Sequence, residues 1–132
     1  MIHHVSVGSN DIRRAIAFYR PLMSLIGLRL IKQSGKAAHY GASDIVFSIE
    51  TPDDGRPATA GNGTHIAFHA PDRRTVRRFH ATALANGGTN EGAPGIRKDY
   101  NANYYAAFVR DLDGNKIEVV TFTARESYDA LD

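Results

Sequence analysis

The chain contains an internal repeat, and this repeat limits the folds that it can adopt. Residues 4–11 match residues 65–72 without a gap, an offset of 61 positions (65 − 4 = 61). At the same offset Phe18 meets Phe79. In both segments a strand-like run that carries a histidine leads to an aspartate, which is a typical first residue of a helix. A repeat of this kind predicts two copies of one supersecondary unit.

Each copy is predicted to form a βαβββ unit. In the first copy, residues 2–8, 28–32, 37–41 and 45–49 have the composition of strands and residues 11–24 have helical periodicity. In the second copy, residues 65–69, 104–111 and 116–122 are expected to be strands, and a helix is expected after Pro71-Asp72. Residues 89–102 hold few apolar side chains and several turn formers, so a long loop is expected there.

The 132 residues are therefore predicted to form a single α+β domain. The expected parts are a first module (1–50), a linker rich in proline and glycine (51–63), a second module (64–122) and a polar tail (123–132). Two tandem βαβββ modules can form an open mixed sheet that lines a cleft.

Composition excludes several classes of partner and chemistry. The formal net charge is only +2, with acidic residues interspersed among basic ones, so no nucleic-acid partner is expected. The absence of cysteine excludes disulfides and thiolate metal sites. No apolar run approaches the ~20 residues that span a bilayer, so no membrane partner is expected. Met1 leads directly into a predicted strand without a signal peptide, which predicts a cytoplasmic protein.

The repeat singles out a candidate metal site. His4 and His65 are equivalent, and neighbouring strand residues point to opposite faces, so His4 rather than His3 should share the cleft with His65. Glu118 stands in an apolar strand, where a carboxylate needs a partner. Two imidazoles and one carboxylate suit a divalent metal such as zinc, nickel, manganese or iron. Alternatively, the histidines are structural or act as general bases, and Glu118 pairs with an arginine.

Four segments carry a resemblance to a known family. They are 2–7, 12–19 with Gly27-Leu28, 64–68 and 107–120. The last of these, AFVRDLDGNKIEVV, is the most specific. The four segments resemble the vicinal-oxygen-chelate superfamily, which contains glyoxalases, bleomycin-resistance proteins and dioxygenases. The resemblance implies a metal held by His4, His65 and Glu118, and it implies a homodimer. The fourth metal position, a carboxylate in glyoxalase I, falls on Phe47 when residue 44 is aligned with residue 115. A three-ligand set is more similar to the dioxygenase or lyase arrangement.

Further residues are expected to bind or transform the substrate. Arg97 and the neighbouring Lys98 could bind an anionic group, and Tyr100, Tyr104 or Tyr105 could donate a proton or stack on a ring. Tyr105 and Glu118 are the predicted catalytic residues. Phe47 and His69 are predicted to line the substrate site, and strand alternation places His69 on the face of His65. Alternatively, the basic pair is surface decoration and one of Tyr104 and Tyr105 packs in the core.

These features predict a metal-dependent enzyme, lyase-like or dioxygenase-like, whose substrate is a small oxygenated metabolite chelated at the metal. The alternative is a metal-free protein of the bleomycin-resistance type that binds a small molecule or drug, and Phe47 at a ligand position suits this alternative.

Overall fold

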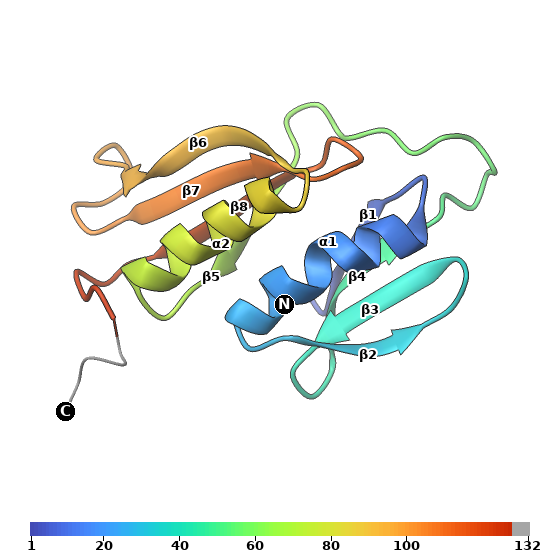
Figure 1. The fold of residues 1–132 in the computed structure, drawn as a ribbon, viewed down its shortest axis with the longest axis horizontal. Helices are drawn as coiled ribbons and strands as arrows, with labels where there is room; N and C mark the ends of the chain where they lie inside the picture. The colour runs from blue at the N-terminus through green and yellow to red at the C-terminus, as the bar shows by residue number, and fades with distance from the viewer. Residues whose placement is uncertain (128–132) are drawn as a thin grey trace.

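The computed structural model describes residues 1–127 of the protein (Figure 1). The part of the predicted tail at 128–132 lies outside the described residues. The strands divide into two four-stranded sheets, and each sheet is accompanied by one helix (Figure 1). Within the described part of the chain, no helix is both long and apolar enough to cross a membrane.

The first module contains β1 (Val5–Gly8), α1 (Ile12–Leu25), β2 (Arg29–Gln33), β3 (Ala37–Gly41) and β4 (Ile45–Glu50). Its sheet has the order β1-β4-β3-β2. The second module contains β5 (His65–His69), α2 (Arg73–Ala85), β6 (Thr89–Ile96), β7 (Tyr105–Arg110) and β8 (Lys116–Thr121). Its sheet has the order β5-β8-β7-β6. In both sheets the first strand pairs in parallel with the last strand of its module, so the predicted βαβββ architecture is confirmed.

The prediction of a long loop at 89–102 was wrong over its first half, which forms β6. This strand lies at the edge of its sheet and pairs only with β7. Its pairing shifts register around Gly92 and again before Gly95. An edge strand tolerates glycine, proline and bulges, because one side of its backbone needs no partner in the sheet. The apolar alternation that marks a central strand is therefore missing from this segment.

The ends of the two helices follow from their sequences. Asp11 accepts a hydrogen bond from the backbone N–H of Arg14 at 3.0 Å, and Asp72 accepts one from Thr75 at 2.7 Å. Beyond the helices, Gly27 and Gly87 have φ angles of +82° and +96°, which favour glycine. Gly87 is thus the structural counterpart of Gly27, one position short of the repeat offset of 61, because α1 has 14 residues and α2 has 13.

The helices cover one face of each sheet and lie side by side (Figure 1). The core fills the space beneath them and contains aromatic residues from both modules. The ring of Phe47 in β4 lies 5.1 Å from that of Phe68 in β5 and 5.2 Å from that of Tyr19 in α1. We call the opposite face of each sheet, which no helix covers, its open face.

Candidate functional site

Three side chains form a polar cluster on the open face of the second sheet. Glu118 in β8 lies opposite Ala67 of β5 and Phe108 of β7. Its Oε1 lies 2.9 Å from Nε2 of His65, and its Oε2 accepts a hydrogen bond from the hydroxyl of Tyr104. The carboxylate is only 2% exposed, whereas the side chain of His65 is 43% exposed. A buried acceptor is thus held between two donors, one of which faces solvent.

The environment of Tyr104 keeps its hydroxyl protonated. Burial raises the pKa of Tyr104 to about 12, and the hydrogen bond to Glu118 adds to this effect. Both causes disfavour a second negative charge beside the carboxylate. At neutral pH Tyr104 is therefore a hydrogen-bond donor to the carboxylate of Glu118.

Aromatic side chains border this polar cluster. The ring of Tyr104 lies 4.9 Å from that of Tyr100 and 5.1 Å from that of Phe122. His69 is on the same open face as His65, and its ring is 6.2 Å from that of Phe122. Tyr100 and Phe122 are 66% and 54% exposed. A cavity of about 660 Å³ adjoins His69, Asn103 and Phe122. The cluster thus provides apolar surface for a ligand beside the polar side chains.

Phe122 was missed at the level of sequence. It follows β8 directly, two positions beyond Val120 and four beyond Glu118. Alternation along the strand would have placed it on the face of Glu118. The predicted strand at 116–122 already included Phe122, so the signal was present in the sequence and was overlooked.

Arg97 follows β6 beside Tyr104, where its backbone N–H donates to the carbonyl of Tyr104 at 2.8 Å, and its side chain reaches back along the same face. Its Nη2 donates a hydrogen bond to the carbonyl of Ala93 at 2.8 Å, and its guanidinium carbon lies 5.5 Å from the ring centre of Phe108. The ring of Phe108 is in turn 6.2 Å from that of His65. Lys98, the next residue, is exposed. Arg97 therefore shares a surface with the His65–Glu118 pair.

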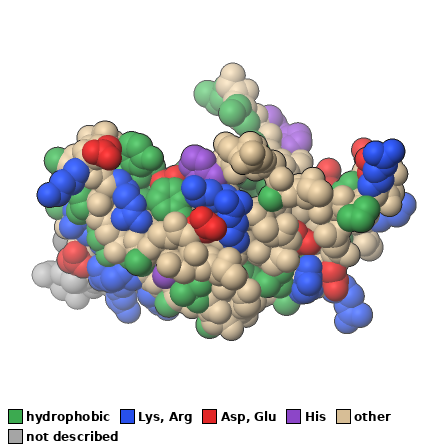
Figure 2. Space-filling model, turned by 90° about the horizontal axis from the view of Figure 1, so that it is seen from above, with side chains coloured by type: hydrophobic (Ala, Val, Ile, Leu, Met, Phe, Trp, Pro, Cys, Tyr) green, Lys and Arg blue, Asp and Glu red, His purple; other side chains and the backbone are tan. Residues whose placement is uncertain are grey.

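His4 does not join this cluster within one chain. It precedes β1 in the first module, and its Nδ1 lies 2.9 Å from Nδ1 of His3. His3 in turn approaches Asp44 at 2.8 Å. Among residues 1–127 no three His, Asp or Glu side chains are placed to hold one metal ion. Figure 2 shows histidine side chains at separate places on one face of the molecule. The structure thus brings together His65 and Glu118, and the three-residue metal set stays a prediction.

Phe47 was assigned to the substrate site, and the structure places it in the core instead. It is fully buried beneath α1. The pairing of β4 explains the error, because Ser48 lies opposite Ser6 and His39 just as Glu118 lies opposite Ala67 and Phe108. The counterpart of Glu118 is therefore Ser48, one residue further along. Its hydroxyl lies 2.7 Å from Nδ1 of His39.

Tyr105 was the second residue predicted to be catalytic. It lies next to Tyr104 in sequence but points to the other side of β7, toward α2. There the guanidinium carbon of Arg73 sits 4.9 Å above its ring. Tyr105 packs against the core, as one of the two tyrosines was expected to do. The hydroxyl that reaches Glu118 belongs to Tyr104.

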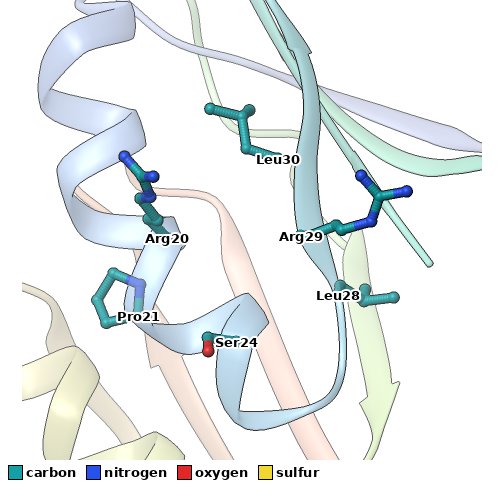
Figure 3. A pocket seen from close by; sticks show the side chains of 6 residues that line it. All are labelled: Arg20, Pro21, Ser24, Leu28, Arg29 and Leu30. Atoms are coloured by element: carbon teal, nitrogen blue, oxygen red, sulfur yellow. The ribbon is translucent and has the colours of Figure 1, made fainter.

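A second cavity of about 490 Å³ lies in the first module between α1 and β2 (Figure 3). It is lined by side chains that include Arg20, Ser24, Arg29 and Leu30. The two guanidinium groups point away from each other (Figure 3). They do not converge on a common point in this cavity.

Comparisons with known proteins agree with this fold. The sequence profile of the Glyoxalase/Bleomycin resistance protein/Dioxygenase superfamily matches residues 1–119. A glyoxalase/bleomycin resistance protein from Albidiferax ferrireducens is 38% identical, with 90% of this chain and 96% of that chain covered and a TM-score of 0.82. A family enzyme from Burkholderia phytofirmans is 18% identical, with 92% and 98% covered and a TM-score of 0.73.

A lactoylglutathione lyase from Agrobacterium tumefaciens is 21% identical, with 92% of each chain covered and a TM-score of 0.63, and this likeness shows the fold alone. No protein of curated function matches the sequence significantly. The paired βαβββ modules and the match over most of the chain show that this protein belongs to the glyoxalase/bleomycin resistance protein/dioxygenase superfamily.

Proposed function

We propose that the protein is a metal-dependent enzyme, lyase-like or dioxygenase-like, that acts on a small oxygenated metabolite. The observation that carries this proposal is the cluster of His65, Glu118 and Tyr104, which combines a buried proton acceptor with a neutral donor on an open face. A site of this kind suits reactions in which a proton leaves a carbon next to an oxygen. We expect a cytoplasmic location.

The roles of the residues follow from their contacts. Glu118 would accept the proton, because its carboxylate is buried and already oriented by two donors. Tyr104 would keep its proton and donate a hydrogen bond to a substrate oxygen or to Glu118. A divalent metal such as zinc, nickel, manganese or iron, when bound, would supply a Lewis acid for two neighbouring substrate oxygens.

Within one chain, the described residues do not form a complete three-ligand metal site. His65 and Glu118 supply two donors in the second module, while His4 belongs to the first. We propose that two copies of the chain form a symmetric homodimer in which His4 of one copy completes the pair of the other. A two-fold dimer would create two equivalent sites in this way.

Calorimetric titration of metal-free protein with zinc, nickel, manganese and iron(II) tests the proposal. We expect one ion per chain, with binding lost in His65→Ala, Glu118→Gln and His4→Ala and kept in the control His3→Ala. A mixture of His4→Ala and Glu118→Gln chains should regain one intact site per mixed dimer. Wild-type protein that takes up none of the four metals would defeat the proposal.

A metal-free binding protein of the bleomycin-resistance type is the second candidate. It is favoured by the two oxygens of Glu118, which both have protein partners already, and by the exposed rings of Tyr100 and Phe122. The two candidates differ in how ligand affinity responds to chelation. Affinity that is the same before and after treatment with EDTA would favour the binding protein.

A further inference from the structure

Two glycines of β6 make room for the guanidinium group of Arg97. A Cβ atom at Gly92 would lie 2.9 Å from Cδ2 of Phe108 and 3.1 Å from Nη2 of Arg97. A Cβ atom at Gly95 would lie 3.2 Å from Nη1 of Arg97. Side chains at either position would compete with the arginine for space. The bulged strand that sequence patterns missed thus positions a cation on the open face.

Lys116 places a second cation beside the same ring. Its Nζ lies 5.1 Å from the ring centre of Phe108. Within residues 1–127 neither Arg97 nor Lys116 has a carboxylate at salt-bridge distance. Arg110, on the same face, does have a carboxylate partner, because its Nε lies 3.1 Å from Oε1 of Glu91. Two cations therefore lie beside the ring of Phe108 without a carboxylate partner among the described residues, and such unpaired positive charge attracts an anion.

The charge and length of this face restrict the anion. Arg97 and Lys116 carry two positive charges and Glu118 carries one negative charge, so the local excess matches a monoanion rather than a phosphate dianion. Phe108 is opposite Glu118, and Phe122 lies four residues further along. At a rise of about 3.3 Å per residue, the backbone positions of Glu118 and Phe122 are about 13 Å apart. A ligand that uses both ends must be elongated.

We propose that the open face of the second sheet binds an elongated organic acid. Its carboxylate binds Arg97 and is attracted by the charge of Lys116, and its apolar or aromatic end lies against Tyr100 and Phe122. The middle of the ligand then passes the His65–Glu118 pair. That the ligand reacts at the His65–Glu118 pair rests on the proposed function, whereas the binding of the acid does not require that function. The planar guanidinium of Arg97 suits a carboxylate, which it can bind through two parallel hydrogen bonds.

Three probes test this inference on the full chain by NMR titration. They are 6-phenylhexanoate, 6-phenyl-1-hexanol, which lacks the charge, and benzoate, which is too short to reach both ends. We expect 6-phenylhexanoate to bind at least about tenfold more tightly than either of the others. Its shifts should be confined to β6, β7, β8 and the segment before β7. Equal affinities of the acid and the alcohol would overturn the proposal.

Variants locate the two ends of the ligand. Arg97→Gln and Lys116→Gln should each weaken 6-phenylhexanoate by about tenfold and leave the alcohol unchanged. Phe122→Ala should weaken both long probes, and the control Arg29→Gln, an exposed arginine of β2, should change neither. Unchanged acid affinity in both cation variants would refute the site. All titrations are repeated with EDTA, which shows whether the acid binds without a metal. Failure of the protein to take up metal would then defeat the proposed function, while binding of the acid in EDTA would still support this inference.

Discussion

The hydroxyl of Tyr19 donates a hydrogen bond of 2.5 Å to Asp111, and this bond joins the two modules inside the protein. Tyr19 belongs to α1, whereas Asp111 follows β7. Asn115 also donates to Asp111, at 2.9 Å, and to the carbonyl of Gly8, at 3.0 Å. The aspartate–asparagine segment that carried the family resemblance is thus a structural link between the halves of the repeat.

Removal of the Tyr19 hydroxyl is expected to destabilise the protein. Tyr19→Phe leaves the buried carboxylate of Asp111 with one donor fewer, which should lower the free energy of unfolding by about 1–3 kcal/mol. Tyr40→Phe is the matched control, because the hydroxyl of Tyr40 is buried and has no hydrogen-bond partner in the part of the chain described. Its loss should leave the free energy of unfolding unchanged or raise it. Urea denaturation measures both, and equal losses in the two variants would contradict the prediction.

Stability is expected to fall in alkaline solution. Burial raises the pKa of Tyr40 to about 12, and burial together with Asp111 raises the pKa of Tyr19. A folded-state pKa above the ordinary value of 10 contributes stability that is fully present below pH 10 and is lost as the pH rises toward the folded-state pKa. Denaturation at a series of pH values above 10 should therefore show a decline, which Tyr40→Phe makes shallower. A decline of the same steepness in this variant would exclude Tyr40 as a cause.

The late titration of Tyr104 provides a separate measurement on the site. Its pKa of about 12 depends first on burial and next on the hydrogen bond with Glu118. In Glu118→Gln the neighbouring negative charge is gone, so the pKa of Tyr104 should move down toward its ordinary value while the effect of burial remains. NMR of ring-labelled tyrosine follows this group, and Tyr104→Phe assigns its signal. An unchanged pKa would mean that the bond to Glu118 does not control this hydroxyl.

Truncation of Phe47 should mainly lower stability, whereas truncation of Phe122 should mainly lower ligand affinity. Phe47→Ala empties a fully buried position and should lower the free energy of unfolding by about 3–5 kcal/mol. Phe122→Ala removes a ring that is 54% exposed and should cost far less stability, while it weakens ligands of the open face. Thermal denaturation and titration with 6-phenylhexanoate separate the two effects. If a stably folded Phe47→Leu variant lost ligand affinity and Phe122→Ala did not, Phe47 rather than Phe122 would belong to the ligand site.

Gly92→Ala tests whether the bulged edge strand positions Arg97. The new methyl group would press on Phe108 and on the guanidinium of Arg97, so the affinity for 6-phenylhexanoate should fall about as far as in Arg97→Gln. Gly35→Ala is the control, because a Cβ there meets no atom within 4 Å. The NMR titrations of the two variants give the comparison. Full affinity in Gly92→Ala would show that Arg97 does not need this space.

The repeat, the helix caps and the strand composition allowed the fold to be predicted before any tertiary structure was known. These signals are local or depend on a constant offset, as with Asp11 and Asp72. The sequence of elements in each module then followed from the repeated unit, whereas the order of the strands within each sheet came from the structure. Residues 65 and 118, the pair on which the proposed function depends, also came from the repeat and the family resemblance.

Only the tertiary structure decided which side chains share a face. A shift of one residue in strand register moves every side chain to the opposite side of the sheet. Such a shift separates Ser48 from Phe47 as the counterpart of Glu118, and the same alternation separates Tyr104 from Tyr105. Pairing between strands, with the bulges of β6, sets this register, and those contacts join residues far apart in the chain. Residue types along the sequence therefore determined the elements, while strand pairing determined which side chains could meet at a site.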